Sequence, residues 1–113
     1  MKDPGLSNWD VSNVLAMDGM FFECSSFNAD LSKWDVSSVR DMDQMFGGCE
    51  SFNSDLSNWN TSNLRLVSYM FKGCKNLNTN LDNWDVSNVE LKFTRFMFDG
   101  CWSMEKLPKW FII

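Results

Sequence analysis

Apolar and polar positions recur along the chain with a fixed period of 25 residues. The clearest copy covers residues 31–55, and residues 6–30 match it at 16 of 25 positions. The further units are residues 56–80, residues 81–106, and a partial or capping unit over 107–113. A period of about 20–50 residues is typical of repeat proteins, in which each unit buries its apolar face against its neighbours. We therefore predict a single domain over residues 1–113.

Within each repeat, the apolar positions predict one short helix and one short strand. In the second repeat, one helix face would carry Val39, Met42, Met45 and Phe46, which follow i, i+3, i+6, i+7 spacing. Gly47-Gly48 would end this helix. Between residues 52 and 59 the apolar positions are sparser, which is typical of a brief strand bounded by turns. The pattern predicts an α/β solenoid, a leucine-rich-repeat-like right-handed coil with one short parallel strand and one short helix per repeat.

Equivalent side chains of successive repeats would form rows along this coil. The two structural rows are Trp9, Trp34, Trp59 and Trp84, and Cys24, Cys49, Cys74 and Cys101. Equivalent cysteines project in parallel from neighbouring coils, which favours buried free thiols over disulfides, whose Cβ atoms must turn toward each other. A row spread over three coil spacings also cannot converge on one zinc ion. We expect neither a metal site nor a cofactor.

The tryptophan row and the acidic rows each have two interpretations. The regular spacing and the flanking Leu and Val favour a core role for tryptophan, whereas a line of aromatic rings beside Asp and Asn is also typical of a sugar-binding surface. Asp10, Asp35 and Asp85 are expected to bond turn backbones at corners. The alternative role of such a row is to supply oxygen ligands to Ca²⁺ between coils.

Composition narrows the function classes further. The net charge of −5 and the scattered Lys and Arg argue against a nucleic-acid partner. No segment approaches the roughly 18–20 consecutive apolar residues of a membrane span. The chain has no histidine, so the commonest general base is missing and we expect no enzyme. A hydrolase that uses aspartate pairs in a groove is the weakest alternative.

The repeats carry the pattern W-D-V-S-x-V-x-x-M-x-x-M-F-x-x-C-x-x-F-N-x-D-L-S-x, most closely in the first two copies. This pattern resembles the bacterial surface protein repeat family of Mycoplasma lipoproteins and of Listeria and Lactobacillus surface proteins. It is also similar to BspA-type leucine-rich repeats, which share the short Phe-x-x-Cys turn. The resemblance implies an extracellular or surface-anchored parent protein with a role in adhesion or partner binding. It brings no catalytic residues.

We therefore predict a non-catalytic binding or spacer module that contacts another protein or a host surface component. The alternative is a lectin-like, glycan-binding domain. Because the chain opens partway through a repeat, we expect the signal and the anchor to lie elsewhere in the parent protein. The predicted partner surface consists of Lys33, Arg40, Gln44, Glu50, Arg65, Lys72, Arg95 and Trp102. The exposed edge of the last coil predicts either a cap or end-to-end self-association.

Overall fold

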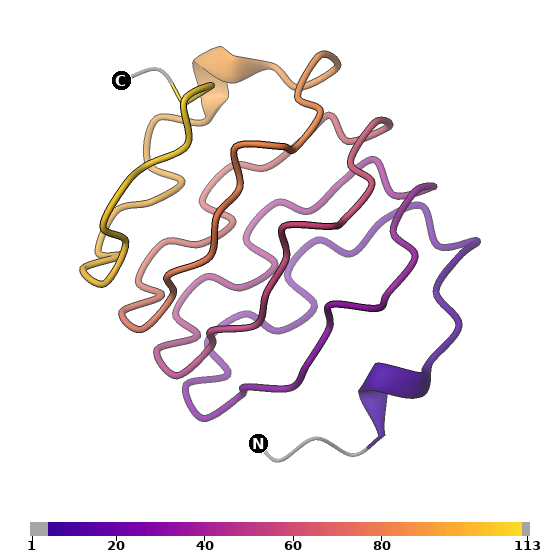
Figure 1. The fold of residues 1–113 in the computed structure, drawn as a ribbon, viewed down its shortest axis with the longest axis horizontal. Coiled ribbons are helices and arrows are strands. Elements are labelled where there is room, and N and C mark those ends of the chain that lie inside the picture. Colours follow the sequence, from indigo (N-terminus) through magenta and orange to yellow (C-terminus); the bar gives the residue numbers. More distant parts are fainter. Residues whose placement is uncertain (1–4, 112–113) are drawn as a thin grey trace.

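The structure, a computed structural model, describes residues 5–111, whose repeats lie side by side as stacked coils (Figure 1). The helices of this part are two short 3-10 turns, η1 at Leu6–Asn8 and η2 at Leu91–Phe93. Strand pairing between described residues is limited to isolated parallel bridges that join Asp41 to Ala16 and to Leu66. None of the described helices has the length and apolar character needed to cross a membrane.

Along one side of the first two coils, every second backbone amide donates a hydrogen bond to the next coil. The N–H groups of Met17, Gly19, Phe21 and Glu23 donate to the carbonyls of Asp41, Asp43, Met45 and Gly47, at 2.6–3.0 Å. The same bonds recur one repeat later, from residues 42, 44, 46 and 48. Several of the intervening amides donate to the carbonyl three residues earlier, as Met45 does to Met42. This part of each coil is therefore a string of tight turns.

The predicted helix over residues 39–46 is wrong. Its amides bond to a neighbouring coil, to the carbonyl three residues earlier or, for Asp43, to the Asp41 carboxylate, whereas an α-helix bonds to the fourth carbonyl. Gln44 and Gly48 also adopt left-handed φ values of 57° and 77°, which an α-helix does not contain. Met42, Met45 and Phe46 are nevertheless buried, because the tight turns direct them into the interior.

The predicted strand over residues 52–59 is also wrong. The Asn53 N–H donates to Asn28 Oδ1 at 2.8 Å, and the Leu56 N–H donates to Thr79 Oγ1 at 3.2 Å. Side-chain oxygens thus take the place of the carbonyls of a partner strand. Without the strand and the helix, neither the α/β solenoid nor the leucine-rich-repeat-like class describes residues 5–111.

The interior is filled by rows of equivalent side chains. The main aromatic row is Phe21, Phe46, Phe71 and Phe98, whose neighbouring ring centroids are 5.7 Å apart. Phe46 also stacks on Phe52 within its own coil, at 4.2 Å. Aromatic pairs at such distances contribute about 0.5–1.5 kcal/mol beyond the burial of their area. Each coil therefore depends on its neighbours for a large part of its packing.

The fourth coil keeps this packing although Val89 and Cys101 are twelve positions apart, two more than the equivalent Val39 and Cys49. The N–H groups of Phe71 and Gly73 still donate to its carbonyls, at 3.2 and 2.7 Å. Element η2 lies in the segment that carries the extra residues, at the outer side of the coil (Figure 1). Phe111 then packs edge-on against Phe98, with centroids 5.1 Å apart. The last described residues thus cover part of the final coil.

We expect Phe46→Ala to lower the free energy of unfolding by about 3–5 kcal/mol, because it empties a fully buried site in the aromatic row. Urea denaturation followed by tryptophan fluorescence would measure the change. Phe22→Ala is the matched control, since this ring is 47% exposed and its loss should cost less than about 1 kcal/mol. Equal losses in the two variants would contradict the assignment of the core.

Candidate functional site

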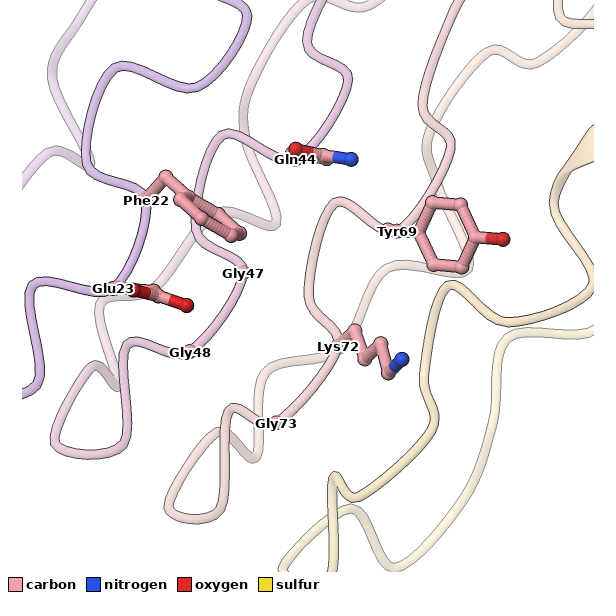
Figure 2. A pocket seen from close by; sticks show the side chains of 8 residues that line it. All are labelled: Phe22, Glu23, Gln44, Gly47, Gly48, Tyr69, Lys72 and Gly73. Carbon is pink, nitrogen blue, oxygen red and sulfur yellow. The ribbon is translucent and has the colours of Figure 1, made fainter.

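A groove of about 590 Å³ lies on the surface of the first three coils (Figure 2). Its lining consists of Phe22, Glu23, Gln44, Gly47, Gly48, Tyr69, Lys72 and Gly73. Phe22 and Glu23 extend over the paired glycines, whereas Tyr69 and Lys72 stand on the far side and lean away from them (Figure 2). The volume falls in the range of ligand sites, roughly 300–1,000 Å³.

The paired glycines Gly47 and Gly48 let side chains of the first coil pack closely against the second. A Cβ atom on Gly47 would lie 3.1 Å from Phe22 Cδ1, so the ring rests directly against the glycine backbone. A Cβ atom on Gly48 would lie 3.2 Å from the Cα atom of Glu23. The first coil carries Phe22-Glu23 where the second carries Gly47-Gly48. Side chains of one coil therefore occupy space that the next coil leaves free.

Backbone strain is concentrated at the same groove. Glu23, Gln44 and Tyr69 are the described residues other than glycine with left-handed backbone, at φ 57–59°, and all three line the groove. One repeat away, the positions equivalent to Gln44 and Glu23 are Gly19 and Gly48. A left-handed conformation costs a residue with a Cβ atom roughly 1–2 kcal/mol. Strain of this kind clusters at functional sites.

A shallower hollow of about 200 Å³ adjoins the groove at Tyr69. It is lined by Ser68, Tyr69, Lys92, Phe93, Arg95 and Phe96. The rings of Tyr69 and Phe96 stack, with centroids 5.8 Å apart and planes 3° from parallel. Three cations lie 5.1–5.4 Å from exposed rings, in the pairs Lys72–Tyr69, Lys92–Phe93 and Arg95–Phe96. We call the groove and the hollow together the aromatic–cation surface.

The cations of this surface have no carboxylate partner among the described residues. The ion pair in that part of the chain joins Lys75 to Glu50, at 2.8 Å. Lys72, Lys92 and Arg95 are all exposed and lie within or beside the two hollows. On a protein of net charge −5, three cations against one lining carboxylate, that of Glu23, make a local excess of positive charge. It would attract anionic groups of a ligand.

The structure brings together three of the eight residues predicted for a partner surface. Gln44 and Lys72 line the groove, and Arg95 lines the adjoining hollow. The other five are exposed but line neither hollow, namely Lys33, Arg40, Glu50, Arg65 and Trp102. The sequence prediction missed Phe22 and Tyr69. The signal for Phe22 was a large aromatic residue where the next repeat has Gly47, and the signal for Tyr69 was an aromatic residue where the first repeat has Gly19.

The tryptophan row lies mostly in the core. Trp34, Trp59 and Trp84 are each 4% exposed, whereas Trp9 in the first coil is 53% exposed. The buried indole Nε1–H groups donate to the carbonyls of Leu6, Leu31 and Leu56 at 2.7–2.9 Å. The three buried rings thus have a structural role and offer no free face to a sugar.

The acidic corner residues bond their own turns. The carboxylates of Asp10, Asp35 and Asp85 accept hydrogen bonds from the hydroxyl and N–H groups of Ser12, Ser37 and Ser87. These bonds, the hydroxyl bond foremost, lower the pKa of each carboxyl. Among residues 5–111, no cluster of three or more acidic or cysteine side chains has the arrangement of a metal site. The geometry supports corner capping.

The cysteine row is a set of free thiols. Cys49, Cys74 and Cys101 are buried, and Cys24 is partly buried. The three buried Sγ–H groups donate to the carbonyls of Phe21, Phe46 and Phe71, at 2.9–3.0 Å. Burial raises the pKa of Cys49 and of Cys101 to about 12. These thiols are therefore inert at neutral pH, because the thiolate is the reactive form.

We expect alkylation of Cys49, Cys74 and Cys101 by iodoacetamide only after unfolding, as measured by mass spectrometry with and without urea. Burial holds the pKa of Cys49 above its ordinary value of 9.0. Its contribution to stability is therefore retained below that pH and lost as the pH rises toward 12, since the unfolded chain then binds fewer protons. Cys49→Ala should reduce this loss of stability at alkaline pH. Rapid labelling of folded Cys49 would contradict the assignment.

We expect Gln44→Gly to raise the free energy of unfolding by about 1 kcal/mol. Glycine removes the strain of the left-handed backbone, which exceeds the roughly 0.5–1 kcal/mol of chain entropy that glycine costs. Lys33→Gly is the control, because Lys33 is exposed in an earlier turn of the same coil without left-handed backbone and its change should destabilise. Urea denaturation compares the two, and a destabilised Gln44→Gly would refute the strain argument.

Comparison with known proteins identifies the family. No curated protein and no solved structure shows a significant match to the chain. A family model described as "Mycoplasma protein of unknown function, DUF285" matches residues 1–110. This match supports the predicted kinship with Mycoplasma repeat proteins, and it does not extend to the BspA-type repeats. The chain belongs to the Mycoplasma DUF285 family.

Proposed function

We propose that the chain is a non-catalytic binding module that recognises a protein partner through its aromatic–cation surface. The observation that carries this proposal is the gathering of exposed rings and unpaired cations around one groove. The exposed rings are Phe22, Tyr69, Phe93 and Phe96. Aromatic residues and arginine are enriched in protein interfaces, and tyrosine and arginine are frequent among residues that dominate binding energy. A concave centre adds the shape that such residues need.

The cellular context of the proposal rests on the sequence resemblance. Repeats of this kind in Mycoplasma, Listeria and Lactobacillus surface proteins favour a cell-surface parent protein with a host component as its partner. The proposed kinship with BspA-type repeats rests on the Phe-x-x-Cys motif alone. In this chain the motif forms a turn, in which the Cys49 N–H donates to the Phe46 carbonyl at 2.9 Å. No leucine-rich-repeat fold is part of the proposal.

Other function classes receive less support from the geometry. A sugar-binding surface along the tryptophan row would need exposed ring faces, whereas Trp34, Trp59 and Trp84 are buried. A hydrolase based on Asp35 and Asp85 would need one carboxyl with a raised pKa as general acid. Both carboxyls instead have a lowered pKa, because each accepts hydrogen bonds from a turn serine. A protein-binding role remains the better supported function.

We expect the purified chain to bind one or more members of a panel of host matrix and surface proteins, measured by surface plasmon resonance. Joint replacement Tyr69→Ala and Phe96→Ala should weaken that binding at least tenfold, since truncating dominant aromatic residues typically costs about 2 kcal/mol or more. Trp9→Ala is the control, because its ring is 53% exposed but lines neither hollow. Binding to a parallel glycan array without binding to any protein of the panel would overturn the proposal.

A further inference from the structure

The groove can hold one large apolar side chain of a ligand. Gly47 and Gly48 line it on the second coil, where Phe22 and Glu23 of the first coil pack against their backbone. Phe22 lies flat on Gly47 at one wall, and Tyr69 stands at the other (Figure 2). An opening of about 590 Å³ exceeds the volume of a single side chain. It therefore has room for the ligand's neighbouring backbone as well.

The strained residues identify which side chains the ligand would contact. Each of the first three coils has two left-handed positions, of which one is glycine and the other is Glu23, Gln44 or Tyr69. A second glycine in each coil would relieve the strain without removing any inter-coil backbone bond. The retained side chains all line the groove. None of the three strained side chains belongs to the core, so packing there does not explain why these positions are not glycine. A contact with a ligand would explain it.

The ring geometry disfavours a sugar as the occupant. Tyr69 stacks on Phe96, and the Lys72 ammonium lies 5.4 Å from the centroid of the Tyr69 ring. Phe22 has one face against Gly47. Stacking on a pyranose needs open ring faces, which are already partly used here. An apolar side chain needs only the ring edges and the space between the two walls.

The charge pattern supplies the second recognition element. The hollow that continues from Tyr69 is lined by Lys92 and Arg95 and by no carboxylate. Lys72 lines the groove on the same side as Tyr69 (Figure 2). All three cations lack an ion pair among the described residues. A ligand that runs from the groove into the hollow would therefore place carboxylates a few residues from its apolar anchor.

Resting on the proposed function, we infer that the groove binds an extended peptide segment of the partner that carries one large apolar or aromatic side chain followed by acidic residues. The apolar side chain enters between Phe22 and Tyr69, beside the paired glycines. The carboxylates lie toward Lys72, Lys92 and Arg95. The amide of Gln44 lies at the groove, where it can bond the peptide backbone.

A displayed library of random dodecapeptides, selected on the intact chain, tests this inference. We expect enrichment of sequences with a large apolar residue and nearby Asp or Glu. Lys72→Glu combined with Arg95→Glu should lower the affinity for a synthetic copy of an enriched peptide at least tenfold, measured by fluorescence anisotropy. Lys109→Glu is the matched control, because Lys109 is exposed and lines neither hollow.

Gln44→Gly separates a binding role from a structural one. This variant should fold more stably, as argued above, and yet bind the enriched peptide at least threefold more weakly. Unchanged affinity would overturn the assigned role of the strained side chains. Enriched peptides that lack acidic residues, or that bind the charge-reversed variant as tightly as the unchanged chain, would overturn this inference and leave the proposed function standing. Failure of both the peptide library and the protein panel would overturn both proposals.

Discussion

Main-chain hydrogen bonds between successive coils are the interaction on which the rest of this structure depends. Every second amide in residues 17–23 and 42–48 donates to the next coil, and several of the amides between them close tight turns. Buried amides are thereby satisfied without a continuous strand or an α-helix. The arrangement repeats with the sequence, so each coil is both donor to the next and acceptor from the one before. Packing of the aromatic rows then follows from the coil spacing.

Polar side chains make further hydrogen bonds between successive coils. The buried indoles and thiols donate to carbonyls of the preceding coil, as Trp59 does to Leu31 and Cys74 to Phe46. Asn53 accepts from the amide of Asn78 in the following coil. Among the described residues, no buried side-chain nitrogen or oxygen lacks a partner. These residues recur in each repeat because every coil presents the same backbone groups.

The binding surface arises where the repeats differ from one another. Two left-handed positions per coil are a consequence of the tight turns, and glycine occupies one of them in each of the first three coils. The second position carries Glu23, Gln44 or Tyr69, at a cost in backbone strain. Gly47 and Gly48 at the same time leave the space into which Phe22 and Glu23 pack. Variation in these few positions changes the surface without disturbing the core rows.

The sequence by itself determined the 25-residue period, the separation of repeating from variable positions, and the candidates Gln44, Lys72 and Arg95. It did not determine the backbone conformation, because the spacing of Met42, Met45 and Phe46 fits a helix face and a string of tight turns equally well. The choice between them depended on hydrogen bonds to the next coil, which are tertiary contacts. Phe22 and Tyr69 become walls of one groove for the same reason. Only stacking brings residues nearly two repeats apart onto one surface.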